Sequence, residues 1–151
     1  MPAKTFVDTN IWLYSLIQSG NDDRHRQASD LLIQLDYPVI NSQVIREICS
    51  NLKKKTRMAE ERLRALIHGW YQGCKVVNSN ASQHLRASHL RDSYSFSYWD
   101  SLIVAAALDA GCTTLYSEDM QHGQKVESEL TILNPFTQFG FVGLRPSARP
   151  A

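Results

Sequence analysis

The stretch SYWDSLIVAAALDAGCTTLYSED, which starts at Ser97, determines the expected class of fold. Ser97 followed three residues later by Asp100 is typical of a helix start. Residues 102–108 are apolar on every side of the helix that follows, and a helix without a polar face is expected in the centre of the molecule. After a glycine, Thr113–Tyr116 has the character of a short strand. The stretch therefore predicts a buried helix that feeds a strand of a sheet.

The rest of the chain repeats this alternation of short strands and helices. Further strands are predicted at Thr5–Val7, Pro38–Ile40, Cys74–Val77 and Thr131–Leu133, and further helices at 10–17, 24–35, from Ser42 as the N-cap, at 59–71 and from Asn80. Such alternation predicts an α/β fold with helices on both faces of a mostly parallel sheet of about five short strands.

Length and composition indicate one globular domain. The chain has 151 residues, of which 43% are hydrophobic and 21% charged. We assign residues 1–136 to the domain and 137–151 to a tail that is partly packed and frayed at its end. Phe136 at the boundary and Phe139 and Phe141 in the tail are expected to pack back on the domain. The net charge of +1 argues neither for nor against a nucleic-acid partner, so any basic surface must be local.

The sequence favours a cytoplasmic protein. The N-terminus has no signal-peptide core, and the longest apolar run, 102–108, is too short to cross a membrane. The three cysteines are widely spaced and odd in number, which is typical of reduced thiols in a core.

Several kinds of site are not supported. There is no Gly-rich nucleotide-binding loop, and the five histidines lack the spacing of a zinc site. Haloacid-dehalogenase-like phosphatases also carry an aspartate after their first strand. Their motif is Asp-x-Asp, whereas the residue in the third position here is Asn10.

Two aspartates follow predicted strands. Asp8 comes directly after the first strand and Asp119 after the fourth. Taken singly, Asp8 is a helix cap and Asp119 a turn residue. The carboxyl ends of parallel strands share one edge of a sheet, however, and two carboxylates held close together favour a cation between them. The pair therefore makes a metal site a competing hypothesis.

Two more acidic residues are candidates of different strength. Asp100 opens the buried helix, whose N-terminus stabilises the ionised form that a hard cation needs. Glu47 lies away from the centre of the apolar stripe of its helix, so its position alone indicates a surface glutamate.

Five short motifs occur in an order that resembles the PIN-domain nucleases, and most closely the small toxins of VapBC-type toxin–antitoxin pairs. The motifs are FVDTNI at 6–11, NSQVIRE at 41–47, YWDSLIVAAA at 98–107, LYSEDM at 115–120 and ILNPF at 132–136. Each motif is weak alone, but the ordered set spans nearly the whole chain.

The resemblance implies a three-layer α/β/α sandwich that cleaves RNA with Mg²⁺ or Mn²⁺. It implies an RNA substrate, a cognate antitoxin protein and a homodimer. By matching position it implies acidic catalytic and metal-binding residues with two polar supports nearby: Asp8, Glu47, Asp100 and Asp119, with Asn10 and Ser117. Whether Glu118 or Asp119 contributes more to the metal stays open, as does the choice between one ion and two. The alternatives are a PIN-like RNA-processing nuclease outside toxin–antitoxin systems and a non-catalytic RNA-binding module.

Contacts to the substrate are expected from basic and aromatic residues near Glu47. Arg46 is a candidate phosphate clamp. The basic cluster just downstream is equally well interpreted as phosphate contacts or as a solvated helix end: Lys53, Lys54, Lys55 and Arg57. Stacking on bases is considered for Tyr14, Trp12 and Tyr98, with core packing favoured for Trp12; Trp99 is predicted to pack against the core.

Overall fold

The computed structural model describes residues 3–18, 20 and 22–137. The expected packing of Phe139 and Phe141 and the frayed tail lie outside these residues, whereas Phe136 packs edge-on against Tyr14. The elements in chain order are β1 (Thr5–Val7), α1 (Thr9–Leu16), α2 (Arg24–Gln34), β2 (Val39–Asn41), α3 (Ser42–Lys55), α4 (Glu60–Gly73), β3 (Lys75–Val77), α5 (Ala81–Ser93), α6 (Tyr98–Asp109), β4 (Thr114–Tyr116), β5 (Lys125–Val126) and β6 (Leu130–Leu133).

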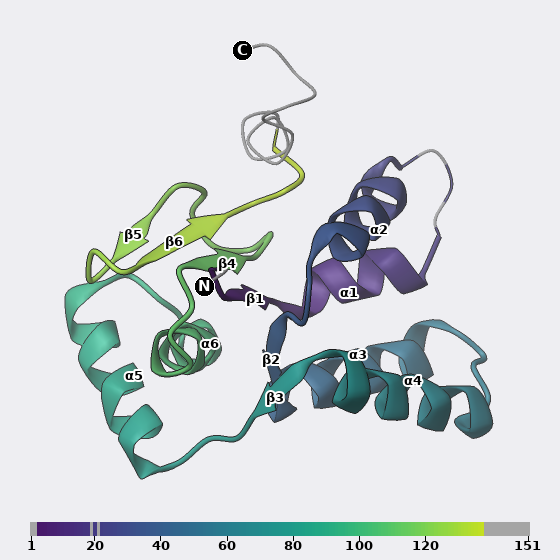
Figure 1. The fold of residues 1–151 in the computed structure, drawn as a ribbon, viewed down its shortest axis with the longest axis horizontal. Coiled ribbons are helices and arrows are strands. Elements are labelled where there is room, and N and C mark those ends of the chain that lie inside the picture. The colour runs from purple at the N-terminus through teal and green to yellow at the C-terminus, as the bar shows by residue number, and fades with distance from the viewer. Residues whose placement is uncertain (1–2, 19, 21, 138–151) are drawn as a thin grey trace.

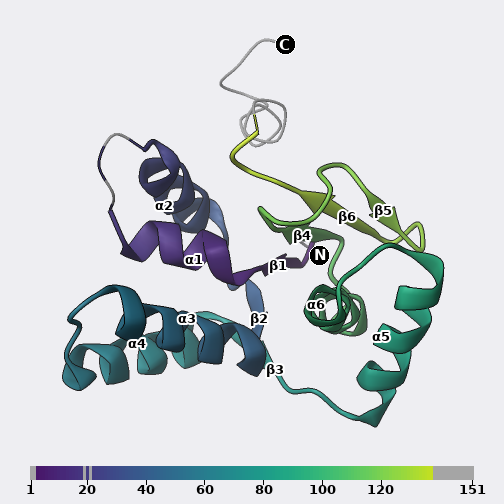
Figure 2. The same ribbon diagram turned by 180° about the vertical axis from the view of Figure 1, so that it is seen from behind.

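These strands form one sheet in the order β3-β2-β1-β4-β6-β5. Every pairing is parallel except that of β5 with β6. Helices α1 to α4 lie on one side of the sheet, and α5 and α6 lie on the other (Figures 1 and 2). The predicted three-layer α/β/α arrangement with a mostly parallel sheet is confirmed.

Strand β5 was missed by the sequence prediction, which expected five strands. It has two residues, too few for an alternating pattern to emerge. The turn that joins it to β6 places Glu127 and Ser128 at positive φ, 53° and 58°. Turns of this backbone shape usually carry glycine or asparagine, so the sequence gave no hairpin signal here.

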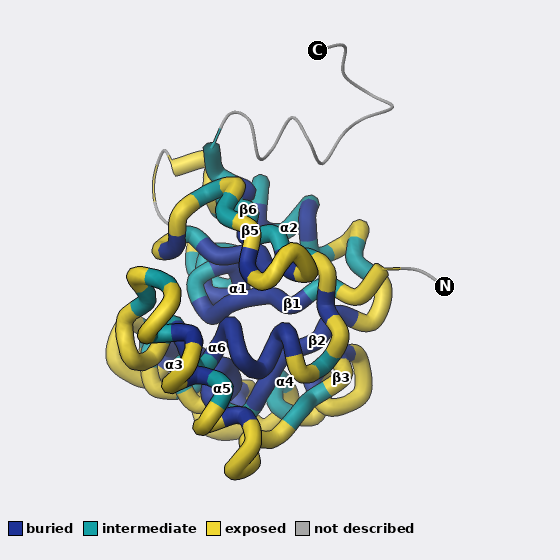
Figure 3. Tube along the Cα trace, turned by 90° about the vertical axis from the view of Figure 1, so that its left-hand side faces the viewer, coloured by how far each residue is buried: buried dark blue, intermediate teal, exposed yellow. Residues whose placement is uncertain are grey.

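Helix α6 occupies the centre of the molecule, as its apolar character predicts. Residues 104–107 are fully buried, and the helix contacts both α5 and β2. Figure 3 shows most of α6 in the colour of buried residues, beside the equally buried β1. The three consecutive alanines allow α6 to approach its neighbours closely, because they carry little side-chain volume.

The predicted helix starts are confirmed at two positions and corrected at a third. Ser97 accepts a hydrogen bond from the Asp100 N–H, and Asn80 accepts one from the Gln83 N–H. For α3, however, the cap is Asn41, whose Oδ1 accepts the Val44 N–H at 3.0 Å, and not Ser42. The reason is that β2 turns directly into α3 without a loop, so the last strand residue is also the cap.

All three cysteines are free, as predicted. Cys74 and Cys112 are buried, and burial raises the pKa of each thiol to about 11. They are therefore protonated at neutral pH and act as small apolar core residues. None of the helices among the described residues has both the length and the apolar character needed to span a bilayer.

A pair of isoleucine substitutions tests the core. Ile40 in β2 is fully buried, whereas Ile33 on α2 is 82% exposed. We expect Ile40→Ala to lower the free energy of unfolding by about 2–5 kcal/mol, because it leaves a cavity beside the sheet. Ile33→Ala should change it by less than about 0.5 kcal/mol. Urea unfolding measures both, and equal effects of the two substitutions would contradict this account of the core.

Candidate functional site

Four acidic side chains from four separate elements line one cavity at the carboxyl edge of the sheet. Asp8 follows β1, Glu47 lies in α3, Asp100 lies in the first turn of α6 and Asp119 follows β4. Residues with neutral side chains complete the cavity wall: Thr9, Asn10, Gln43, Asn51, Trp99 and Ile103. The structure therefore brings together all four acidic residues that the sequence singled out.

The pairing of β1 with β4 fixes the position of Asp8. Val7 lies opposite Tyr116, and the Asp8 N–H donates to the Tyr116 carbonyl oxygen at 2.9 Å. This register places Ser117 beside Asp8, and the Ser117 hydroxyl donates to Asp8 Oδ2 at 3.0 Å. Asp8 Oδ1 accepts the Thr9 N–H at 2.8 Å and so also caps α1. The Asp8 carboxylate thus both caps α1 and forms part of the candidate site.

Burial dominates the electrostatics of this cavity. Asp8 is only 8% exposed, and the loss of hydration raises the pKa of its carboxyl group to about 7. The hydrogen bonds from Thr9 and Ser117 oppose this rise, whereas the nearby charges of Glu47 and Asp100 add to it. Burial also raises the pKa of Asp100. A hydrogen bond with the Ser97 side chain opposes this rise, and the nearby charge of Asp119 adds to it.

Glu47 belongs to the cavity and is not a solvated surface glutamate, which is what its position in the sequence alone indicated. It is half-buried, and its Oε1 accepts the Thr9 hydroxyl at 2.7 Å. Gln43, Glu47 and Asn51 follow one another at four-residue spacing on α3 and all face the cavity. The sequence contained a signal for this arrangement, because the polar residues repeat every four positions beside the apolar stripe. The sequence analysis did not identify Gln43 and Asn51 as site residues from it.

Asp119 and Glu118 face different surroundings. Asn10 Nδ2 donates to Asp119 Oδ2 at 2.9 Å, within the acidic cavity. Glu118 instead accepts the Tyr14 hydroxyl at 3.0 Å and pairs with Arg24 at 3.5 Å, beside a separate hollow. Of these two neighbours, the structure turns Asp119 toward the other acids.

The chemistry of the cavity suits a hard divalent cation. The available donors are carboxylate, amide and hydroxyl oxygens, which Mg²⁺ and Mn²⁺ prefer. A cation would also offset the cost of ionising the buried Asp8 next to two other acids. Among the described residues, however, no three acidic, imidazole or thiol groups already converge as a complete ligand set. Hydrogen bonds from Ser117, Thr9 and Asn10 each engage one of three carboxylates, those of Asp8, Glu47 and Asp119.

The basic residues near Glu47 separate into two kinds. Lys53 pairs with Glu60 at 2.9 Å and donates to the Met58 carbonyl oxygen, so it is occupied at the far end of α3. Arg46 and Lys54 are exposed and line a hollow next to the acidic cavity. Among the described residues, no carboxylate pairs with either of them.

Trp12 and Trp99, which lie near Asp8 and Asp100 in the sequence, differ in burial. Trp12 is buried, its Nε1 donates to the Val7 carbonyl oxygen, and it packs edge-on against Trp70, so its predicted core role is confirmed. The prediction that Trp99 packs against the core is wrong, because Trp99 is 61% exposed. It lies in the first turn of α6 and lines the acidic cavity.

Comparisons with known proteins agree with this architecture. A family model described as the PIN domain matches residues 5–125. The chain is similar to VapC20 of Mycobacterium tuberculosis, a toxin that cleaves the sarcin-ricin loop, with a TM-score of 0.61, 20% identity, and coverage of 77% of this chain and 90% of that one. It is also similar to a chain of a toxin–antitoxin complex from Klebsiella pneumoniae, with a TM-score of 0.65, 17% identity, and coverage of 89% and 98%. These two likenesses show a shared fold. No curated protein matches the chain.

The raised pKa of Asp8 makes the stability of the metal-free protein depend on pH. The pKa is about 7 in the folded protein and has its ordinary value of 3.8 in the unfolded chain, so between these values only the folded protein keeps the proton. Stability contributed by this group therefore falls as the pH rises through this window. Above about pH 7 the full cost, on the order of a few kcal/mol, is present.

We therefore expect Asp8→Asn to raise the Tm of the metal-free protein at about pH 8 and to change it little at about pH 4. Asparagine has the same shape and can still cap α1. Thermal unfolding in EDTA across this range measures the effect. The control is Asp92→Asn, at an exposed position on α5, which should give no pH-dependent gain. A gain from Asp8→Asn that is the same at both pH values would contradict burial as its cause.

Proposed function

The chain belongs to the PIN domain family, and on that premise we propose that it is a metal-dependent endoribonuclease. The observation that carries the proposal is the meeting of four carboxylates from four separate elements in one cavity. Folding like charges together in this way is unfavourable unless the site serves a cation. In this proposal the catalytic residues are Asp8, Glu47, Asp100 and Asp119.

Mg²⁺ or Mn²⁺ would be held by Asp8, Asp100 and Asp119. Such an ion lowers the pKa of water and neutralises the charge on the phosphate oxygens. The chain's own polar residues orient these acids. Ser117 and the Thr9 N–H fix the two oxygens of Asp8, and Asn10 fixes one oxygen of Asp119.

Glu47 would orient the attacking water. The Thr9 hydroxyl engages Oε1, and none of the described residues makes a hydrogen bond with Oε2, which is then available to accept one from water. The water oxygen would form a bond to phosphorus and release a proton to solvent, the bond from phosphorus to the leaving oxygen would break, and that oxygen would take up a proton from solvent. Thr9 therefore acts as a positioning residue for this step.

We further propose that the protein is the toxin of a toxin–antitoxin pair. Its fold is shared with a toxin and with a chain of a toxin–antitoxin complex. A protein antitoxin, a homodimer and a cytoplasmic location are parts of this proposal. The presence of all four acidic residues at one cavity favours a catalytic protein over a non-catalytic RNA-binding module.

Removal of the metal and of single acids tests the nuclease. We expect cleavage of RNA with Mg²⁺ to stop in EDTA and to fall at least about 100-fold in Asp8→Asn or Asp119→Asn, because each substitution removes a charged oxygen ligand. Glu118→Gln is the matched control, since it alters the neighbouring carboxyl and retains a partner for Tyr14. Gel analysis of a labelled RNA measures all of these. Cleavage that is unchanged in EDTA or in Asp8→Asn would contradict the nuclease proposal.

The toxin assignment has a separate test. Expression of the wild-type chain should arrest growth, and expression of Asp8→Asn should not, because arrest requires cleavage. Co-expression of the neighbouring reading frame should restore growth through a complex that co-purifies with this chain. Harmless expression of a protein that cleaves RNA in vitro would leave the nuclease proposal intact and contradict the toxin proposal.

A further inference from the structure

A second hollow adjoins the acidic cavity, and we call it the side groove. Its lining is Gln43, Arg46, Glu47, Ser50, Asn51, Lys54 and Trp99. Four of these residues, Gln43, Glu47, Asn51 and Trp99, also line the acidic cavity. The two hollows therefore adjoin, and a chain molecule that reaches the acids would also lie beside the side groove.

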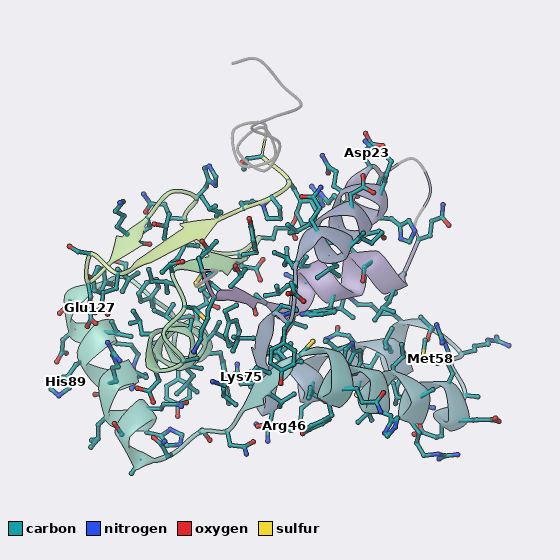
Figure 4. The ribbon with its side chains drawn as sticks, viewed as in Figure 1. Asp23, Arg46, Met58, Lys75, His89 and Glu127 are labelled. Atoms are coloured by element: carbon teal, nitrogen blue, oxygen red, sulfur yellow. The ribbon has the colours of Figure 1, made fainter. Side chains whose placement is uncertain are left out.

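Helix α3 divides its surface between the two hollows. Its polar stripe of Gln43, Glu47 and Asn51 faces the acidic cavity. One position earlier in each turn, Arg46, Ser50 and Lys54 form a parallel stripe that lines the side groove. Figure 4 labels Arg46 at the lower border of the molecule in that view. The carboxylate of Glu47 and the cations of Arg46 and Lys54 thus lie on neighbouring stripes of a single helix.

Arg46 and Lys54 are available to a ligand. Both are exposed, and among the residues that the structure describes none with a carboxylate pairs with them. They are eight residues apart on α3, which separates them by about 12 Å along the helix axis. An extended polyanion would therefore meet them at different phosphates. Lys53, by contrast, is held by Glu60.

Trp99 forms the wall that the acidic cavity and the side groove share. It is 61% exposed, although tryptophan is usually mostly buried, and it lines three adjoining hollows. An exposed large aromatic ring at the rim of a polar cleft is a typical surface for binding a ligand. The indole is therefore available for stacking next to the acidic residues.

Tyr98 supports this ring. The two rings meet edge to face, with centroids 5.0 Å apart and an interplanar angle of 88°. The Arg91 guanidinium lies 4.8 Å from the Tyr98 centroid and donates to Ser101 Oγ at 2.6 Å. Tyr98 lines neither the acidic cavity nor the side groove, so Trp99 is the ring of the pair that faces both hollows.

We propose that the side groove binds single-stranded RNA beside the cleavage point, with an unpaired base stacked on Trp99 and phosphates on Arg46 and Lys54. The choice of RNA rests on the proposed function. An unpaired base is required because the faces of a base inside a duplex are covered by its neighbours. The proposal adds a stacking residue to the substrate path and makes the enzyme selective for single strands.

Binding of a labelled RNA tests the stacking. The probe is a fluorescein-labelled oligoadenylate of about 12 nucleotides, and the protein carries Asp8→Asn so that the RNA stays intact. Fluorescence anisotropy should show binding weakened roughly 5- to 150-fold by Trp99→Ala, and partly restored by Trp99→Phe. The same oligonucleotide annealed to its complement should bind more weakly than the single strand. Tyr71→Ala removes an exposed aromatic ring on α4 and should leave binding unchanged.

Salt dependence separates stacking from phosphate contact. Arg46→Gln and Lys54→Gln should each reduce the slope of log affinity against log salt by about 0.7, the value for one phosphate of a single strand. Trp99→Ala should weaken binding without changing that slope. Lys53→Gln is the matched control and should change neither. RNA should also quench the indole fluorescence, and Trp99→Ala should abolish the quenching, because Trp12 and Trp70 are buried.

Two results would overturn the inference. One is wild-type affinity for the oligoadenylate in a folded Trp99→Ala protein. The other is the finding, by light scattering, that Trp99→Ala dissociates a dimer while each protomer still binds RNA normally, which would assign Trp99 to a second copy of the chain. Failure of the nuclease proposal is distinct from both: it would appear as absent metal-dependent cleavage, with RNA binding still dependent on Trp99.

Discussion

The parallel pairing of β1 with β4 is the constraint on which the candidate site depends. Its register places Val7 opposite Tyr116, and the two chains then leave the sheet side by side. The first residue beyond each strand, Asp8 and Ser117, meet in a hydrogen bond of 3.0 Å. Asp119 follows two residues later, and Asn10 ties it back to α1. A slip of this register would separate all of these contacts at once.

The site carries an energetic conflict that the surrounding fold holds in place. Asp8 and Asp100 lie where burial raises the pKa of each, and neighbouring carboxylates raise it further. Such an arrangement lowers the stability of the metal-free protein. The fully buried centre of α6 and the central strands hold the acids in position against this repulsion. The conflict supports the proposal that a cation binds here.

Helix α3 carries three stripes of side chains with different surroundings. Ile48 and Leu52 of its apolar stripe are fully buried in the core. A second stripe carries Glu47 to the acidic cavity, and a third carries Arg46 and Lys54 to the side groove. Because the stripes belong to one rigid helix, the core fixes the spacing between the candidate catalytic acid and the cations. A substrate bound to the groove would therefore be aligned with the acids.

The sequence by itself determined the features that depend on local chemistry. The alternation of strands and helices, the buried α6 and the caps at Ser97 and Asn80 are set by residues close together in the chain, and all were predicted. The gathering of Asp8 and Asp119 at one edge also followed, since parallel strands share their carboxyl ends, and Asp100 was a candidate because it opens the buried helix. For Glu47 the residue pattern was insufficient, and only the family motif indicated a role.

The tertiary structure alone decided which neighbours in space each side chain meets. It gave Glu47 its partner Thr9, turned Glu118 toward Tyr14 and away from the acids, and exposed Trp99. It also made Asn41 the cap of α3 and added β5 through a turn without glycine. These outcomes depend on contacts between residues far apart in the chain or on backbone geometry that a few residues do not encode. Local periodicity carries information about which face of an element is buried, but none about what lies across from it.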